Sequence, residues 1–240
     1  MAVPSDVGSK YRDEGYYIVP DLFTRPEVER WKQEIRSILD DVREEMRQRG
    51  EDPARRLVSG VYVGLAVRSP LFRDLARDPR LLDYLEPMIG PNIAFFSDKI
   101  VFKDHTTDFG SPWHQDWPYW KGSHKISIWI ALDDATEENG CLMLVPGSHK
   151  GYVEHGHKDD QKGFVNRIDP ESIDQDKVVT AAIPAGGAIF FHDLTLHSSH
   201  PNRSGADRWA LISTYRDAKA EDPVYDFAKA AAVVRGEGRP

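Results

Sequence analysis

The sequence predicts a mainly β protein with flanking helices, and two observations carry this prediction. Helical patterns dominate about residues 1–92, whereas short alternating segments separated by Gly and Pro turns fill about residues 93–216. Helices followed by many short strands are typical of a β-sandwich or open barrel with helices packed outside. We therefore expect one domain of three parts: a helical part at 1–92, a β core at 93–216 and a C-terminal helix or tail at 217–240.

The helical part contains clear start and stop signals. Thr24 and Glu27 form a capping box with a proline inside the first turn. Gly50 is the expected stop of this helix. Shorter helices are expected over residues 70–75 and 79–90, each opened by a polar residue followed by proline. Helical spacing is kept by the apolar residues of the long helix, which are Val28, Trp31, Ile35, Ile38, Leu39, Val42 and Met46.

Strand patterns begin near Ile93. Alternating residues at 99–103 and 126–132 predict half-buried strands. Asn139-Gly140 indicates a hairpin turn between the second of these strands and an apolar segment at 141–145, although the loop is longer than two residues.

The rest of the chain divides into a loop, two strands and a helix. Polar, irregular residues 154–177 predict a long surface loop. The turn at 184–187 precedes an expected strand at 188–191, and a further strand is expected from Arg208 to Tyr215. Asp222-Pro223 is a helix start signal, so we expect a short helix that ends near Gly236.

Composition excludes several classes of protein. There are 31 Lys and Arg against 39 Asp and Glu, a formal charge of −8, which argues against a nucleic-acid partner. No apolar run suits a membrane helix, and the first residues lack the pattern of a signal peptide. The lone Cys141 excludes an internal disulfide and a thiolate-built metal site. We expect a cytoplasmic protein without a membrane partner, and its nine histidines become the residues to explain.

The segment 113–117 offers candidate metal ligands. In a strand, residues i and i+2 face the same side, so His114 and Asp116 would point into one pocket. An imidazole and a carboxylate are two members of the 2-His-1-carboxylate triad, which leaves metal positions open for other ligands. By itself His-x-Asp is also common as a hydrogen-bonded surface pair. Composition does not choose the third ligand from the candidates His192, His197 and His200.

Arg208 opens an apolar strand, residues 208–212. A guanidinium at the edge of such a strand needs a partner, and a bidentate carboxylate is the usual one. That partner is either an Asp or Glu of the protein or the distal carboxylate of a diacid cosubstrate.

Several ordered motifs resemble the phytanoyl-CoA dioxygenase family of Fe(II)- and 2-oxoglutarate-dependent oxygenases, which also contains ectoine hydroxylases. The resemblance runs from about residue 11 to 216. It implies a double-stranded β-helix (a jelly roll, cupin-like) and the use of Fe(II), 2-oxoglutarate and O2. The motifs, in chain order, are Gly15-Tyr16, Val19-Pro20, His114-Gln115-Asp116, residues 128–134, 138–142 and 146–150, and residues 197–204 followed by Arg208.

The resemblance also implies roles for particular residues. His114, Asp116 and His197 would bind iron, because His197 keeps the family spacing of eleven residues before Arg208. Arg208 would hold the distal carboxylate of 2-oxoglutarate, with the hydroxyl of Ser199 close by. Trp129 takes the position of a tryptophan that packs against the cosubstrate, and a plain core role for it is equally open. Related halogenases lack the carboxylate, so Asp116 favours hydroxylation.

Two positions depart from the family pattern. Lys99 stands where the phytanoyl-CoA enzyme looks apolar, which points to an acidic substrate. Lys99, Val101 and Lys103 would share one strand face, and a solvated face with two lysines explains them slightly better. Tyr62 falls near the position of a cosubstrate-contacting lysine, so that contact has no match. An aromatic cluster next to the ligand pair would line the substrate pocket or belong to the core; it consists of Trp113, Trp117, Tyr119 and Trp120.

The implied function is hydroxylation of a small molecule, with release of succinate and carbon dioxide. One rival is a zinc hydrolase that uses the same three ligands and a bound water. It would need a general base beside the metal, and none stands at a recognisable offset. The other rival is a non-catalytic jelly-roll binding module. The sequence identifies neither the substrate nor the outcome among hydroxylation, desaturation and epoxidation, and the compact chain favours a free small molecule over an acyl-CoA.

Overall fold

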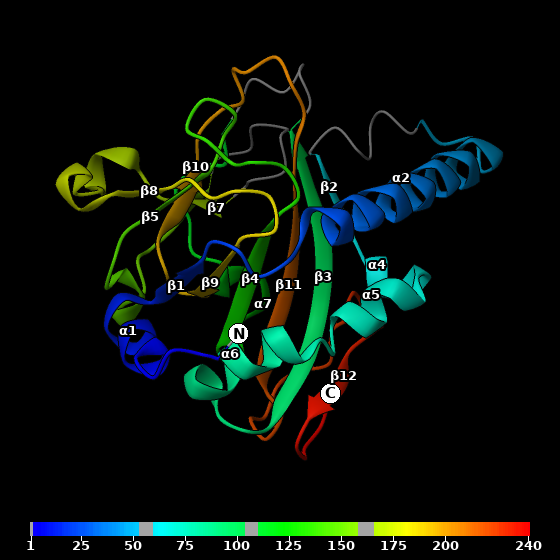
Figure 1. Ribbon diagram of the computed structural model, residues 1–240. Coiled ribbons are helices and arrows are strands. Elements are labelled where there is room, and N and C mark those ends of the chain that lie inside the picture. Colours follow the sequence, from blue (N-terminus) through cyan, green and yellow to red (C-terminus); the bar gives the residue numbers. More distant parts are fainter. Residues whose placement is uncertain (1, 53–59, 104–109, 158–165) are drawn as a thin grey trace.

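Two antiparallel sheets form the centre of the molecule (Figure 1). The computed structural model describes residues 2–52, 60–103, 110–157 and 166–240. The large sheet contains, in spatial order, β1 (Tyr16–Val19), β9 (Ala188–His192), β4 (Lys125–Ala131), β11 (Arg208–Asp217), β3 (Ile93–Lys103) and β12 (Ala232–Arg235), with β2 (Val61–Val63) also paired to β3. The small sheet contains β10 (His197–Ser199), β5 (Leu142–Leu144) and β8 (Val179–Ala181), and a separate pair contains β6 (Gly156–His157) and β7 (Asn166–Arg167).

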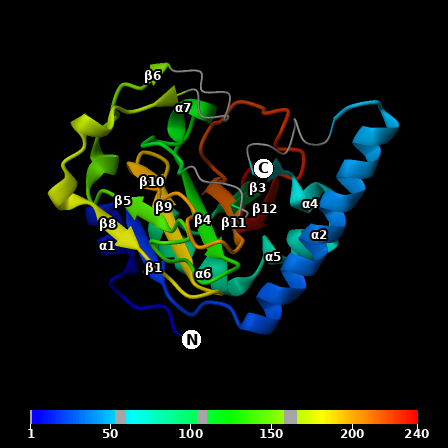
Figure 2. The same cartoon turned by 90° about the horizontal axis from the view of Figure 1, so that it is seen from above.

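Helices cover the outer face of the large sheet. In the view from above, α2 flanks one side of this sheet and the small sheet flanks the other (Figure 2). Antiparallel sheets with helices packed outside confirm the predicted fold class. Among the described residues, no helix combines the length and the apolar character that crossing a bilayer requires. The helices are α1 (Val7–Glu14), α2 (Arg25–Gln48), α4 (Leu65–Arg68), α5 (Pro70–Leu75), α6 (Pro79–Ile89) and α7 (Trp117–Trp120), with 3-10 turns η1 (Ser148–Lys150), η2 (Pro170–Ser172) and η3 (Gln175–Lys177).

The predicted helices form where their local signals place them. At the start of α2, the Glu27 carboxylate accepts a hydrogen bond from the backbone N–H of Thr24 at 2.8 Å. All seven apolar residues that define the helical pattern are buried against the large sheet and its neighbouring helices. The helix ends at Gln48, just before Gly50, whose φ of 72° lies in the left-handed region that favours glycine. The predictions for α5 and α6 are also confirmed.

Strand β4 separates two layers of core. Ile126, Ile128 and Ile130 pack against the helices, whereas Trp129 and Ala131 face the small sheet. All seven residues of β4 are buried, so the expectation of a half-buried strand is wrong on this point. The cause is that each face of the large sheet is covered, one by helices and one by the second sheet. The inner layer between the sheets is where the candidate site lies.

The expected hairpin around Asn139-Gly140 is wrong. β4 pairs with β11 and β9, whereas β5 pairs with β10 and β8, so the two strands belong to different sheets. The intervening loop is closed locally, because Asn139 accepts a hydrogen bond from the backbone N–H of Thr136 and donates one to the carbonyl of Asp134. A loop of this length lets the chain cross from one sheet to the other.

Two further expectations differ from the structure. The loop predicted at 154–177 contains β6, β7, η2 and η3, and residues 158–165 of it lie outside the described residues. The helix expected after Asp222 is absent: residues 217–240 contain no helix, and β12 pairs instead with β3. The Asp222 carboxylate lies 2.9 Å from the ammonium of Lys125, both buried, and accepts from the backbone of Ser123. It is therefore engaged in a tertiary contact and caps no helix.

Candidate metal centre

Three predicted ligands meet at one point between the sheets. The Nε2 atom of His114 lies 3.7 Å from Oδ1 of Asp116, and Nε2 of His197 lies 3.8 Å from the same oxygen. One nitrogen or oxygen atom from each of the three residues lies within 4.8 Å of the other two, and all three side chains are buried. Atoms this close can share one divalent ion at roughly 2 Å from each. The donor set is that of the 2-His-1-carboxylate triad.

A bridge between two distant segments places these ligands. The backbone N–H of His114 donates to the carbonyl of His197 at 3.0 Å, and the N–H of His197 donates to the carbonyl of His114 at 3.1 Å. Asp116 then has helical backbone angles (φ −77°, ψ −29°) and leads into α7. Segment 114–116 is thus a bridge followed by a helical turn. The expected convergence of His114 and Asp116 is present, but strand alternation does not cause it.

The imidazole rings are oriented by backbone carbonyls. Nδ1 of His114 lies 2.7 Å from the carbonyl of Pro112, and Nδ1 of His197 lies 2.9 Å from the carbonyl of Thr195. A carbonyl only accepts hydrogen bonds, so Nδ1 carries the proton in each ring and the Nε2 lone pair is directed to the triad. Burial lowers the pKa of His114 to about 3 and also lowers that of His197. Both rings are therefore neutral at ordinary pH, as metal ligation requires.

Asp116 is the charged member of the triad. Burial acts to raise the pKa of its carboxyl group, but the nearby ammonium of Lys99 and the two imidazoles lower it below its usual value. The hydroxyl of Ser127 donates to Oδ2 of Asp116 at 3.2 Å. The carboxylate is thus ionised and oriented, with Oδ1 directed to both histidines.

The other candidate histidines lie elsewhere. His192 groups with His124 and Asp193, and its Nδ1 accepts a hydrogen bond from the backbone of Leu194. His200 follows β10, and its backbone carbonyl faces Lys103. Of the three histidines that composition left open, the structure brings only His197 to the triad.

Arg208 lines the same cavity as the triad and is 1% exposed. Within residues 2–52, 60–103, 110–157 and 166–240, its Nε and Nη1 atoms have no hydrogen-bond partner. Burial lowers the pKa of this guanidinium to about 10. Asp133, whose charge acts on Arg208, instead accepts hydrogen bonds from Lys32 at 2.6 Å and from the backbone of Trp209 at 2.9 Å. A buried guanidinium without a partner is costly, so this site is suited to the carboxylate of a ligand.

Trp129 and Ser199, the two residues expected near the cosubstrate, also line this cavity. The guanidinium carbon of Arg208 lies 5.4 Å from the centre of the Trp129 ring, within cation–π range. The Ser199 hydroxyl accepts hydrogen bonds from the ammonium of Lys103 at 2.8 Å and from the backbone N–H of Ser111 at 2.9 Å. These contacts place one indole and one hydroxyl on the cavity wall near Arg208, with the ammonium of Lys103 bonded to the hydroxyl.

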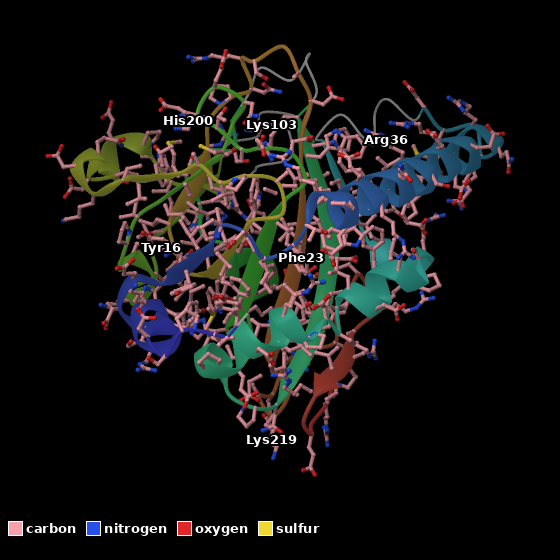
Figure 3. All side chains as sticks on the ribbon, viewed as in Figure 1. Tyr16, Phe23, Arg36, Lys103, His200 and Lys219 are labelled. Atoms are coloured by element: carbon pink, nitrogen blue, oxygen red, sulfur yellow. The ribbon has the colours of Figure 1, made fainter. Side chains whose placement is uncertain are left out.

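The solvated lysine face expected on β3 is wrong. Lys103 is buried and hydrogen-bonded to Ser199 and to the carbonyl of His200. Figure 3 labels Lys103 and His200 at the same end of the molecule. Lys99 and Val101 line the cavity. Lys103 reaches the site through Ser199 and is not among the described residues that line the cavity; alternation along β3 places it on the face of Lys99, but the sequence favours a solvated face. Burial lowers the pKa of Lys103 to about 7, and the charge of Arg208 adds to this effect.

Tyr62 does not enter the cavity. Its hydroxyl accepts a hydrogen bond from Nε of Arg68 at 2.7 Å, and its ring packs against the outer core. The preceding residue on β2, Val61, lines the cavity. Because successive strand residues face opposite sides, Tyr62 points away from the site.

The aromatic cluster supports the metal centre from outside the cavity. None of its four residues is among the described residues that line the cavity. Trp113 packs in a small core cluster with Val145 and Leu196. The indole N–H of Trp120 donates to the Asp193 carboxylate at 2.9 Å. The indole N–H of Trp117 donates to the carbonyl of Gly122, and the Tyr119 hydroxyl donates to that of Asn166. These contacts hold the segments around the metal centre together, so the four aromatic residues belong to the fold and not to the cavity wall.

Comparison with known proteins agrees with this geometry. The family model described as phytanoyl-CoA dioxygenase (PhyH) matches residues 11–210. L-proline trans-4-hydroxylase from Streptomyces griseoviridis is 28% identical over 232 residues, covering 88% of this chain and 85% of that protein. A probable alpha-ketoglutarate-dependent hypophosphite dioxygenase from Stutzerimonas stutzeri is 29% identical over 231 residues, covering 88% and 78%.

Solved structures share the fold. The apo non-heme monooxygenase ThoJ superposes with a TM-score of 0.79 at 22% identity, covering 97% of this chain and 84% of that one. SnoN, a non-heme alpha ketoglutarate dependent epimerase from nogalamycin biosynthesis, gives a TM-score of 0.70 at 21% identity, covering 97% and 96%. These likenesses confirm the expected jelly-roll architecture.

Proposed function

Because the chain belongs to the phytanoyl-CoA dioxygenase family and is a 2-oxoglutarate-dependent non-haem iron oxygenase, we propose that it hydroxylates a free small molecule and converts 2-oxoglutarate to succinate and carbon dioxide. Family membership overturns the zinc-hydrolase alternative and the non-catalytic module. The observation that most supports the proposal is the buried guanidinium of Arg208, which lacks a hydrogen-bond partner for Nε and Nη1 in the described chain and lies in the same cavity as the triad.

The donor atoms fit the metal and the cosubstrate. His114, Asp116 and His197 would hold Fe(II), because two neutral imidazoles and one ionised carboxylate converge there. Arg208 would bind the distal carboxylate of 2-oxoglutarate through a charge-assisted pair. When bound, iron and 2-oxoglutarate supply the oxidising chemistry with O2, for which the triad leaves positions open.

The chain's own residues orient the reactants and exclude water. The carbonyls of Pro112 and Thr195 fix the two imidazole tautomers, so the rings need no rearrangement on metal binding. Trp129, Phe191 and Ile212 form apolar walls of the cavity. Because apolar walls exclude water, they strengthen the electrostatic contact of Arg208 with its ligand and protect a reactive site from solvent.

The relatives suggest the size of the substrate. One curated relative is named L-proline trans-4-hydroxylase, and the match spans most of both chains. We therefore place the substrate among free small molecules of that size, ahead of an acyl-CoA. Because two of the solved relatives are named as an epimerase and a carbocyclase, the product must be identified as well as the consumption of cosubstrate.

The test is a substrate screen in the presence of Fe(II), 2-oxoglutarate and 18O2. We expect one 18O atom in the hydroxylated product and one in succinate, with one carbon dioxide released per turnover. Asp116→Ala should abolish turnover, whereas Asp176→Ala, which changes an exposed carboxylate, should leave it intact. A product without 18O would contradict hydroxylation.

A further inference from the structure

Lys99 is a second cation on the wall of the cavity. It lies on β3 and lines the cavity together with His114 and Asp116. Across the parts of the chain that the structure describes, the Lys99 ammonium makes no hydrogen bond or ion pair.

Strand register separates Lys99 from Arg208. On the paired strands β3 and β11, Arg208 lies opposite Lys103, whereas Lys99 lies opposite Ile212. Four residues along a strand correspond to about 13 Å. The two cations therefore enter the cavity from different rows of the sheet: Lys99 lies in the row of Ile212 and Trp129, whereas Arg208 lies four residues further along β11. A carboxylate held by Arg208 leaves the ammonium of Lys99 available to another group.

The charge balance favours an anion as that group. Among the described residues that line the cavity, the charged ones are Lys99, Arg208 and Asp116. A divalent metal and the dianion of 2-oxoglutarate cancel each other, so these described side chains leave one positive charge over. An uncompensated charge in a largely buried cavity is unfavourable. An anionic second ligand removes this cost.

We propose that the ammonium of Lys99 binds an oxyanion of the primary substrate, so that the substrate is an organic acid or another small anion. The inference rests on the proposed function, because it places the substrate beside the metal. Lys99 then determines specificity: it holds the anionic end of the substrate near the triad and disfavours neutral and cationic molecules of the same shape.

The test is binding in the absence of oxygen. The enzyme with Fe(II) and 2-oxoglutarate is titrated with short aliphatic carboxylic acids and their primary amides, and the change in the weak visible charge-transfer band is followed. The native protein should bind the acids at least about tenfold more tightly than the amides, the magnitude of one hydrogen bond between charged groups. Lys99→Met should remove this preference, Lys99→Arg should keep it, and Lys99→Glu should favour the corresponding amines.

The control is Lys150→Met, which removes an exposed lysine away from the cavity and should bind as the native protein does. The affinity for 2-oxoglutarate, measured from the same band, shows whether Lys99 binds an oxyanion of the primary substrate or one of the cosubstrate. If Lys99→Met weakens 2-oxoglutarate as much as it weakens the acids, Lys99 serves the cosubstrate and the inference is wrong. Equal binding of acids and amides by the native protein, or binding of neither, also contradicts it. Failure of the band to form in the native protein overturns the proposed function and this inference together.

Discussion

Arg208 lies against the face of Trp129, with its guanidinium carbon 5.4 Å from the ring centre, while its Nε and Nη1 atoms contact no acceptor in the described residues. The two residues stand on the neighbouring strands β11 and β4, so the sheet itself sets their relation. The ring face holds the guanidinium by a cation–π contact and leaves its hydrogen-bonding edge unused. This edge is what a carboxylate recognises.

Arg208→Met should weaken 2-oxoglutarate binding by about a hundredfold or more, because one side of a buried charge pair is lost. The ligand-free variant should be as stable as the native protein or more stable, since an unpaired buried charge is replaced by an apolar side chain. Thermal unfolding with and without Ni(II) and 2-oxoglutarate measures both effects. Arg30→Met, an exposed change on α2, is the control. A strongly destabilised ligand-free variant would mean that Arg208 pairs with the protein itself.

His197→Ala should reduce Fe(II) affinity by at least about a hundredfold, because a direct ligand is lost. Loss of a group that only orients a ligand already costs about 10- to 100-fold. His192→Ala removes a histidine five residues earlier that does not reach the triad, so its metal affinity should change little. Metal content after dialysis and the visible spectrum with Co(II) are the measurements. Equal losses in the two variants would show that His192 also serves the metal centre.

Asp193 connects the metal ligands to the aromatic cluster. Its buried carboxylate accepts from the indole of Trp120 and from the backbone of Lys125 at 3.0 Å, and its carbonyl accepts from the backbone N–H of Asp116 at 2.8 Å. Asp193→Ala should cost about 2–5 kcal/mol of unfolding free energy, because buried donors lose their acceptor.

The same variant keeps the backbone carbonyl that accepts from Asp116, so metal affinity should fall by less than the roughly 10- to 100-fold that loss of a ligand-orienting side chain costs. Urea unfolding and metal titration measure the two effects, with Asp176→Ala as the exposed control. A loss of metal affinity of about 100-fold or more in a folded Asp193→Ala protein would show that the carboxylate itself is needed to position Asp116.

Asp98 makes stability depend on pH. Its Oδ2 accepts from the backbone N–H of Ala66 at 2.8 Å, its Oδ1 has no hydrogen-bond partner among the described residues, and burial raises the pKa of the carboxyl to about 7. The folded protein therefore binds this proton more tightly than the unfolded chain does. The resulting stabilisation is complete below about pH 4 and is lost as the pH rises through about 7.

Asp98→Asn should remove this dependence. Relative to the native protein, the variant should gain on the order of 3 kcal/mol at about pH 8 compared with about pH 4. Urea unfolding of both proteins across this range is the measurement. Parallel stability curves for the two proteins would show that Asp98 keeps an ordinary pKa in the folded state.

The sequence by itself determined the helices α2, α5 and α6 and the candidates for the site. The start of α2 at Thr24 and its end before Gly50 depend on contacts within one or two turns, so local signals suffice to predict them. The motif around His114 and Asp116, and the spacing of His197 and Arg208, identified the family and through it the site. Residues alone did not choose His197 over His192 and His200; that choice came from the resemblance.

The tertiary structure decided which distant segments meet. The bridge between His114 and His197 creates the triad, and the pairing of β11 with β3 brings Lys103 beside Arg208. The same long-range contacts separate β4 from β5 and commit Asp222 to Lys125 in place of a helix cap. Local patterns could not predict these outcomes. A strand's period states only which residues share a face, whereas its partner and register depend on which pairing buries those faces across the whole molecule.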